Sequence, residues 1–245
     1  MQPAIDISRD TLEKLKKCSQ GTLTTQLFKR GFRQQFLVGL SPLNRDAGAF
    51  AGEAFTLRFI PSREDKDWSL EDLKVRGEDN LQWEAVEAID EGQVMMIDSR
   101  NDPSAASAGN MLITRMMRKG VAAAVTDGAF RDGAEIGTMP FPAYCRLNTA
   151  TTRPAYHRAI AMQEPIGCGG VAVYPGDIVV GDADGVTVIP RALAAEIAED
   201  SYEQERRERF IFTKIDAGAS LFGTYPAGPE TLEEYKAWLA EGNDL

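Results

Sequence analysis

Histidine and cysteine are scarce in this sequence. Its 245 residues include one histidine, His157, and the residues around it do not resemble the turn that carries a catalytic nucleophile. A Ser-His-Asp or Cys-His system would have to use this imidazole, so we interpret His157 as structural. The cysteines, Cys18, Cys145 and Cys168, are odd in number and widely spaced. That spacing argues against a disulfide framework or a zinc cluster and predicts small buried thiols.

Long apolar runs and an excess of basic charge are also missing. No stretch reaches the roughly 18 uninterrupted apolar residues of a membrane helix, and the first residues lack the basic-then-apolar pattern of a signal peptide. We therefore expect a cytoplasmic protein that does not bind a membrane. With 27 basic and 37 acidic side chains the net charge is −10. This predicts no nucleic-acid partner, because phosphate neutralisation dominates such binding.

Three other kinds of site lack the residues or the spacing that they need. The run 167–170 does not have the spacing of a dinucleotide-binding loop, and no Gly-Lys-Ser/Thr motif occurs. Lys119 lies at a predicted helix end rather than on an apolar strand, which disfavours Schiff-base chemistry. Asp177, Asp182 and Asp184 fit glycine turns better than a calcium-binding loop. With histidine and cysteine scarce as well, any metal should be a hard, oxygen-bound cation, Mg²⁺ or Mn²⁺.

What the sequence does have is the composition of an ordinary folded domain and the patterning of the α/β class. Its 43% hydrophobic and 26% charged residues argue against disorder. Periodicity predicts helices over 8–30, capped by Ser8 and broken at Gly21, and over 81–89, 109–119, 191–214 and part of 225–245. It predicts strands over 53–60, 94–97, 121–126, 170–173, 175–182 and 185–190. The charged stretch 61–80 should cross the surface or form a lid.

The strand-helix-strand pattern over 94–126 is the most informative. Such a unit has parallel strands and a right-handed crossover, so the loops 98–108 and 127–132 should leave the sheet at the same edge. Ligands of open α/β sheets usually bind at that edge. The helix between the strands opens with Gly109, Asn110, Met111 and Leu112. Its free backbone amides predict a carboxylate site.

Charged residues follow on the second loop. Arg131 can add a bidentate fork to a bound carboxylate, Asp132 can hold one divalent cation, and Glu135 can orient a water on that cation. Arg131 and Asp132 also fit an ordinary charged loop, because adjacent residues of a regular strand point to opposite faces. Gly128 favours the site, because a turn at this glycine would let neighbouring side chains converge.

Three stretches carry a family resemblance: the helix start 109–112, the run 127–132 followed by Glu135, and the glycine turns over 175–186. Together they resemble the family of regulator of ribonuclease activity A and the class II 4-hydroxy-4-methyl-2-oxoglutarate (4-carboxy-4-hydroxy-2-oxoadipate) aldolases, over about residues 20–220. In those aldolases the arginine binds the pyruvate carboxylate, the aspartate ligates Mg²⁺ or Mn²⁺, and helix-start amides complete the carboxylate site. The resemblance implies these roles for Arg131, for Asp132, and for Met111 with Leu112.

The resemblance also implies a partner. In this family a glutamate on the C-terminal helix of a neighbouring subunit lies near the metal waters. Its counterpart here would be Glu205 or Glu208, and spacing does not choose between them. Where relatives often have an acidic residue after the helix-start glycine, this chain has Asn110. Because that glutamate comes from a neighbouring subunit, we expect a homotrimer or homohexamer with sites between subunits.

The implied fold is a layered β-β-α, swivelling-domain-like arrangement with N- and C-terminal helices. We expect one domain over 1–245, with a core at about 20–220. The charged insertion at about 61–92 and the extension at about 221–245 go beyond the compact members of the family. Both are expected to shape the entrance to the site or an oligomer interface.

The implied activity is that of a divalent-metal-dependent lyase. It would cleave a small 4-hydroxy-2-oxo acid to pyruvate and a carbonyl compound, with oxaloacetate decarboxylation as a side activity. A second hypothesis is a non-catalytic, ribonuclease-binding regulator. A third, methyl transfer to a quinone, has no cofactor-binding glycine loop to support it. The sequence does not fix the second carbonyl product.

Overall fold

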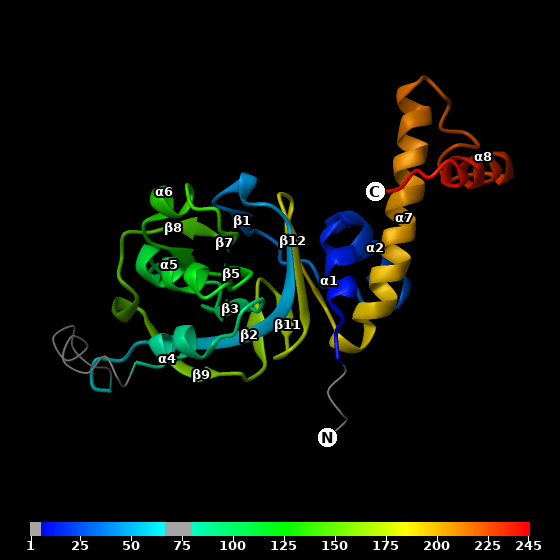
Figure 1. The fold of residues 1–245 in the computed structure, drawn as a ribbon. Helices are drawn as coiled ribbons and strands as arrows, with labels where there is room; N and C mark the ends of the chain where they lie inside the picture. Colours follow the sequence, from blue (N-terminus) through cyan, green and yellow to red (C-terminus); the bar gives the residue numbers. More distant parts are fainter. Residues whose placement is uncertain (1–5, 67–79) are drawn as a thin grey trace.

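The computed structural model describes residues 6–66 and 80–245, and Figure 1 shows their arrangement. The stretch 61–80, which was predicted to cross the surface or form a lid, falls largely on 67–79, which lies outside the described residues, as does Trp68. Residues before that gap continue the strand predicted over 53–60, which runs from Phe50 to Pro61. The helix predicted over 81–89 is present from Leu81 to Ala88.

A mixed sheet forms the centre of the described protein. Its strand order is β1-β7-β5-β3-β2-β12-β13, and β9 pairs with β2. Strands β2, β3, β5 and β7 are parallel to one another, which confirms the parallel pair predicted over 94–126. The strands of this sheet are β1 (Ser41–Pro42), β2 (Phe50–Pro61), β3 (Val94–Asp98), β5 (Ala123–Thr126), β7 (Ala143–Cys145), β9 (His157–Met162), β12 (Ile178–Asp182) and β13 (Gly185–Ile189).

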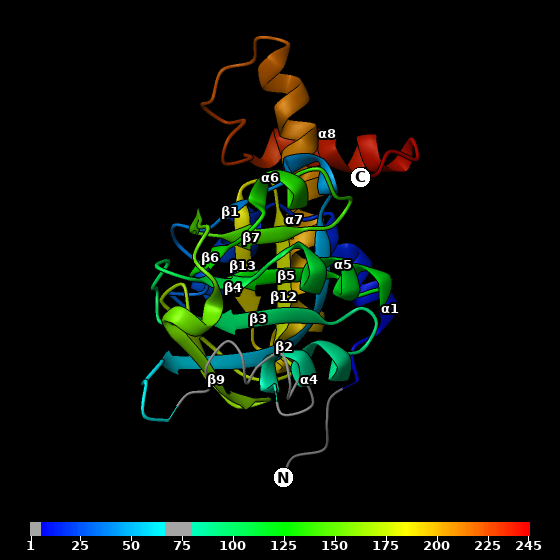
Figure 2. The same ribbon diagram turned by 90° about the vertical axis from the view of Figure 1, so that its left-hand side faces the viewer.

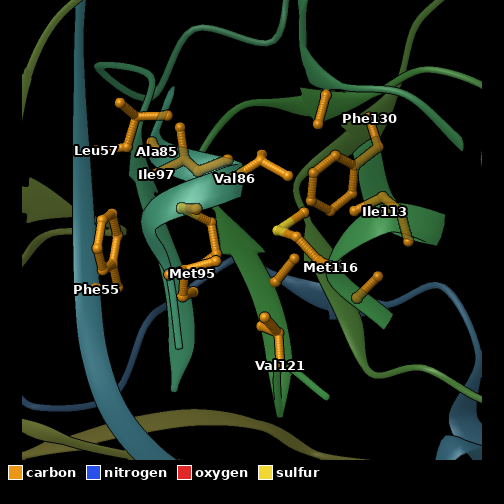
Figure 3. Packing of buried hydrophobic residues seen from close by; sticks show 14 of the residues in the cluster. Phe55, Leu57, Ala85, Val86, Met95, Ile97, Ile113, Met116, Val121 and Phe130 are labelled. Carbon is orange, nitrogen blue, oxygen red and sulfur yellow. The ribbon is translucent and has the colours of Figure 1, made fainter. Parts of the chain in front are cut away.

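Helices α4 (Leu81–Ala88) and α5 (Asn110–Arg118) cover one face of this sheet. Figure 3 shows the apolar side chains between the layers: Phe55 and Met95 from the strands meet Val86 from α4 and Met116 from α5. All four side chains are buried. For Met116 this is expected, because it lies on the apolar face of α5. The opposite face packs on the hairpin of β10 (Ile166–Cys168) and β11 (Val171–Val173). It also packs on β12 and β13 of the same sheet, because the sheet curls.

A third layer consists of α1 (Arg9–Lys16), α2 (Gln20–Lys29) and α7 (Ala194–Asp216), which pack against the outside of β12 and β13. The predicted break between two helical pieces is present, but it lies at residues 17–19 and not at Gly21. Ser19 accepts a hydrogen bond from Thr22 N and so begins α2, which places Gly21 inside that helix. The layered β-β-α architecture with terminal helices is confirmed.

Helix α7 extends beyond the rest of the molecule and carries α8 (Pro229–Ala240) near its far end (Figures 1 and 2). It begins three residues later than predicted, after a 3-10 turn over Arg191–Leu193. The two helices share a small apolar cluster in which Phe210 contacts Tyr235 and Trp238. No helix in the described part of the chain has both the length and the apolarity to cross a membrane.

A second, smaller sheet lies beyond the ends of the central strands and was not predicted. Its strands are β4 (Ala106–Ala108), β6 (Ala129–Phe130) and β8 (Leu147–Asn148), and all three are parallel. The predicted loops 98–108 and 127–132 do leave the central sheet at the same edge. Each loop contains one of these short strands. The second sheet thus extends the carboxyl edge of the first one.

Candidate active site

The predicted site residues meet at the carboxyl ends of the three short parallel strands. Gly109 follows β4, Arg131 follows β6, and Thr149 follows β8. Backbone hydrogen bonds continue the pairing past the strands, from Arg131 N to Ala108 O (2.9 Å) and from Thr149 N to Phe130 O (3.0 Å). Three chain segments that are far apart in sequence are therefore held within a few ångströms of one another.

Asp132 has a backbone conformation that is uncommon for a residue with a side chain. Its φ of +64° and ψ of +33° lie in the left-handed region, at the residue that begins the short helix α6 (Gly133–Ile136). The turn there directs its carboxylate to the start of α5, where Oδ2 accepts a hydrogen bond from Asn110 N at 3.2 Å. The Arg131 Nε lies 3.6 Å from the same oxygen. Arg131 and Asp132 therefore converge.

The sequence predicted a turn at Gly128 as the cause of this convergence, and the chain does bend at residues 127–128, but the left-handed turn that directs the carboxylate is at Asp132. Gly128 does not have a positive φ. A Cβ at this position would lie 2.7 Å from the Ser99 Cβ and 3.0 Å from the Ser107 Oγ. Gly128 is therefore needed for close packing where the two sheets meet, while Asp132 itself makes the turn.

Gly109 leaves the space that the Asp132 carboxylate occupies. An added Cβ would lie 2.9 Å from Asp132 Oδ2 and 3.6 Å from Arg131 Nε. Gly109 also begins α5 without a side-chain cap, and the first intrahelical bond is from Ile113 N to Gly109 O. The amides of Met111 and Leu112 precede that bond and carry the positive end of the helix dipole. They are positioned to bind a carboxylate.

Glu135 joins this group through Asn110. The Asn110 Nδ2 donates to Glu135 Oε2 at 2.6 Å, and Glu135 N donates to Asp132 O at 3.0 Å. The carboxylates of Asp132 and Glu135 are therefore linked through one asparagine, at the position where an acidic residue is common in the family that the sequence resembles.

A buried polar network supports the edge from below. The Ser107 Oγ lies 2.7 Å from Ser99 Oγ and 2.6 Å from Thr126 Oγ1, and Gly128 N donates to the same Thr126 oxygen at 3.0 Å. Gln82 of α4 donates to Ser107 O. These groups are fully or almost fully buried, so their mutual hydrogen bonds avoid the cost of unpaired polar atoms.

Asp127 lies in the same run as Asp132 and is fully buried. Its carboxylate accepts hydrogen bonds from Ser99 N (2.7 Å), Asn101 N (3.0 Å) and Gly169 N (3.4 Å). Burial raises the pKa of this carboxyl, the amide of Ser99 lowers it, and the charge of Asp98 raises it further, with a net rise. Asp127 connects three loops and has no open space in front of it.

His157 and the cysteines have structural surroundings. The buried imidazole has Arg100 Nη2 2.9 Å from Nδ1 and Ala105 O 3.2 Å from Nε2, a pairing that suits the neutral ring. Burial lowers the pKa of His157, and the charge of Arg100 lowers it further. All three cysteines are buried and unbridged, as predicted.

A cavity of about 340 Å³ opens beside Arg131. Its floor and sides come from α4, α5, β4 and the turn η3 (Arg153–Ala155). The lining residues are Asn80, Gln82, Trp83, Ala106, Ala108, Gly109, Asn110, Met111, Leu112, Arg131, Thr152, Arg153 and Pro154. Arg131 also borders a neighbouring hollow that is lined by Asp132, Asn148, Thr149 and Ala150. Of these lining residues, the sequence predicted only 109–112, Arg131 and Asp132. The others, Trp83 and Asn148 among them, have no sequence signal that places them beside Gly109.

The two glutamates expected from a neighbouring subunit lie elsewhere in the protomer. Glu205 and Glu208 are on α7, on the opposite side of β12 from α5 (Figure 1). Glu205 Oε1 accepts from Ser19 N (2.9 Å) and Ser19 Oγ (2.7 Å), and Glu208 accepts from Gln204 Nε2 (2.9 Å). Within one chain, neither reaches Asp132.

The residues around Asp132 suit a hard cation. Its side chain is about one-third exposed, the space beside it is kept free by Gly109, and the neighbouring groups, Asn110 and Glu135, offer oxygen. Among the described residues, no group of three or more His, Cys, Asp or Glu side chains could hold a metal. One carboxylate supplemented by water and substrate is a usual arrangement for Mg²⁺. The donor set therefore fits Mg²⁺ or Mn²⁺ and does not fit structural zinc.

Comparisons with known proteins identify the family of this chain. A family model described as RraA-like (Aldolase/RraA) matches residues 18–188. A Halalkalibacterium halodurans protein named "Putative 4-hydroxy-4-methyl-2-oxoglutarate aldolase" is 36% identical over 151 residues, which cover 59% of this chain and 71% of that protein. The chain belongs to the RraA-like family, and its fold is that of RraA-like proteins.

Two solved structures share the fold. Streptomyces coelicolor RraAS2, described as an unusual member of the RNase ES inhibitor RraA protein family, has a TM-score of 0.76 and 28% identity, covering 85% of this chain and all of that one. A Geobacillus kaustophilus protein described as an S-adenosylmethionine:2-dimethylmenaquinone methyltransferase has a TM-score of 0.53 and 25% identity, covering 68% and 94%. The names attached to this fold differ in activity, so the site must decide the function.

Proposed function

We propose that this chain is a divalent-metal-dependent lyase that cleaves a 4-hydroxy-2-oxo acid to pyruvate and a carbonyl compound. The observation that carries the proposal is the convergence of Arg131 and Asp132 on the amino end of α5, beside a cavity. A carboxylate-binding group and a cation-binding group side by side match the adjacent C1 carboxylate and C2 carbonyl of a 2-oxo acid.

Arg131 and the helix amides would bind the substrate carboxylate. The guanidinium supplies a planar fork of donors, and the amides of Met111 and Leu112 supply further donors at the positive end of the helix. Together they orient the 2-oxo acid so that its reactive end extends into the cavity. Fixing a carboxylate in this way contributes to catalysis mainly through orientation.

Asp132 would hold the cation. When bound, a divalent ion supplies Lewis-acid stabilisation of negative charge that develops on the substrate oxygens. The chain holds Asp132 for this purpose through the left-handed turn and the Asn110 amide. Glu135, positioned by Asn110, is the neighbouring carboxylate that we assign to moving the proton.

The reaction balances without a redox partner. The C4 hydroxyl loses its proton to the base, the C4–O bond becomes a carbonyl, and the C3–C4 bond breaks. Its electron pair passes to C3 and yields the enolate of pyruvate, and a proton delivered to C3 completes the methyl group. Oxaloacetate decarboxylation gives the same enolate by loss of CO₂, so we propose it as a side activity.

We also propose that the protein works as a homotrimer or homohexamer in which Glu205 or Glu208 of one protomer approaches the site of the next. The support is the shape of α7 and α8, which extend away from the sheets (Figure 2). Phe212 and Phe222 on this extension are 67% and 96% exposed, as expected of side chains that another protomer covers.

A second candidate function is binding of a ribonuclease, which the description of the S. coelicolor structure favours. The two functions differ in their need for a cation and a small substrate. Binding to a ribonuclease surface requires neither the left-handed turn at Asp132 nor the free amides of α5.

Metal removal separates these candidates. We expect the purified protein to release pyruvate from oxaloacetate and from at least one 4-hydroxy-2-oxo acid, as measured by coupled oxidation of NADH with lactate dehydrogenase. Treatment with EDTA and desalting should lower the rate by about 100-fold or more, and Mg²⁺ or Mn²⁺ should restore it. The coupling enzyme with added pyruvate serves as the EDTA control. A rate that is unchanged after metal removal would contradict the proposal, and the absence of pyruvate from every substrate would favour the binding function.

A further inference from the structure

The cavity beside Arg131 is larger than the part of the substrate that Arg131 and the helix amides bind. It measures about 340 Å³. A pyruvate unit takes up roughly the volume of three or four water molecules, about 100 Å³ at about 30 Å³ each. Well over half of the cavity is therefore left for the group attached to C4 of the substrate.

The wall of this remaining space is mostly apolar. Trp83 projects from α4, Met111 and Leu112 come from α5, and Pro154 lies opposite in η3. Trp83 is 47% exposed and Met111 is 76% exposed. Two large apolar side chains that face one cavity and remain open to solvent gain free energy when an apolar ligand covers them.

Four polar side chains on the wall, those of Asn80, Gln82, Asn110 and Arg153, already have partners within the protein. Asn80 accepts from Gln82 N at 3.2 Å, and the Gln82 side chain donates to Ser107 O. Asn110 donates to Glu135, and Arg153 donates to His157 O at 2.9 Å. A second carboxylate on the substrate would have to compete for donors that hold the surrounding loops together.

From these observations we infer that the C4 substituent of the substrate is apolar, aromatic or branched aliphatic, and that Trp83 and Met111 form the subsite that receives it. The inference rests on the proposed function, and it assigns the chemical class of the second product: an aldehyde or ketone with an apolar group. Arg131 binds one end of the substrate, and Trp83 packs against the other.

Two kinds of measurement test the inference. The first compares kcat/KM for 4-hydroxy-2-oxo-4-phenylbutanoate, 4-hydroxy-2-oxopentanoate and 4-hydroxy-2-oxoglutarate. We expect the phenyl compound to exceed the dicarboxylate by about 10-fold or more, since apolar contacts in a pocket discriminate by roughly 10- to 200-fold. Cleavage of the dicarboxylate at an equal or higher kcat/KM overturns the inference and leaves the lyase function standing.

The second measurement is binding, which does not depend on turnover. 2-Oxo-4-phenylbutanoate and 2-oxoglutarate both lack the C4 hydroxyl and cannot be cleaved. Isothermal titration of the Mg²⁺-loaded protein should give a Kd about 10-fold lower for the phenyl compound. If no substrate yields pyruvate, the lyase function fails, and the order of these two Kd values still decides the nature of the subsite.

Variants of Trp83 make the test specific to the subsite. In Trp83→Ala we expect the ratio of kcat/KM for the phenyl compound to that for oxaloacetate to fall by about 30-fold, whereas Trp83→Phe should keep most of the ratio. Trp83→Arg should shift the preference toward the dicarboxylate. Tyr174→Ala removes an exposed aromatic side chain that does not line the cavity, and it is the matched control. An unchanged ratio in Trp83→Ala overturns the assignment of Trp83.

Discussion

Two aspartates five residues apart, Asp127 and Asp132, have opposite surroundings. Asp127 follows β5, is fully buried and accepts hydrogen bonds from three backbone amides of different loops. Asp132 follows β6, is partly exposed and accepts from one amide at a helix start. The carboxylate of Asp127 therefore connects loops at the end of β5, whereas the carboxylate of Asp132 lies at the edge of a cavity after β6.

The two carboxylates differ in how many oxygen lone pairs remain available to a ligand. Three amides engage the oxygens of Asp127, so it has little capacity left for a ligand. Asp132 keeps lone pairs for a cation and occupies a backbone conformation that costs of order 1 kcal/mol or more. This contrast is the basis for the role that we propose for Asp132 and for a structural role of Asp127.

The largest effect is expected from Asp132→Asn. Asparagine tolerates the left-handed region as aspartate does, so the backbone should remain as it is while the charge is lost. We expect kcat/KM for oxaloacetate to fall by about 10³-fold, or about 4 kcal/mol, with little change in the urea midpoint. Mn²⁺ binding, followed by electron paramagnetic resonance, should weaken in parallel. A wild-type rate in this variant would show that Asp132 does not hold the catalytic cation.

The intermediate effect is expected from Asp127→Asn. An amide nitrogen would face backbone N–H donors, so we expect a loss of about 1–3 kcal/mol in the free energy of unfolding by urea. The exposed Asp184→Asn should change it by less than about 0.5 kcal/mol and is the control. If Asp127→Asn lowered activity without lowering stability, the division of roles between the two aspartates would be wrong.

The loss of unfolding free energy in Asp127→Asn should depend on pH. Because the pKa of Asp127 is raised in the folded state, the folded protein keeps this proton to a higher pH than the unfolded chain does. The contribution of the group to stability is complete below the unfolded pKa of about 3.8. It falls as the pH rises through the folded value. The stability difference between wild type and Asp127→Asn should therefore shrink as the pH rises above about 4.

The smallest effect is expected from Gly109→Ala, which leaves both aspartates in the sequence. The new Cβ would lie 2.9 Å from Asp132 Oδ2, so that carboxylate must move by a few tenths of an ångström. We expect about a 10-fold loss in kcat/KM, or about 1.4 kcal/mol, and weaker Mn²⁺ binding. Gly167→Ala is the matched control, because a Cβ there meets nothing within 4 Å. Equal activities of the two alanine variants would contradict the close packing of Gly109 against Asp132.

Much of the architecture could be predicted from the sequence because it depends on local patterns. The buried strands β3 and β5 and the helix α5 between them have clear apolar periodicity and a glycine stop at Gly120. Their parallel pairing follows from the connection. The meeting of the α5 start with Arg131 and Asp132 follows in turn from that pairing. This much of the site needed no knowledge of the rest of the chain.

The remainder depends on contacts between distant segments. Strands β4, β6 and β8 have two or three residues each, too few to show a period-2 pattern. Gly128 lies at a bend as expected, but its lack of a side chain also permits close contact with Ser99, which sequence proximity does not reveal. Trp83 precedes Gly109 by 26 residues and reaches the cavity through the packing of α4 on α5. None of these contacts leaves a local signal.

The parallel strands β4, β6 and β8 hold one part of the site, and a helix holds another. Arg131 and Asp132 belong to strand ends whose backbones are fixed by pairing, whereas Trp83 lies on a helix outside both sheets. On the proposed function, changes to the exposed face of α4 would alter which substrates are accepted while the strand ends stay in place. The buried face of α4, with Gln82 and Val86, would be kept, and a designer would graft only a different exposed face onto the same strand ends.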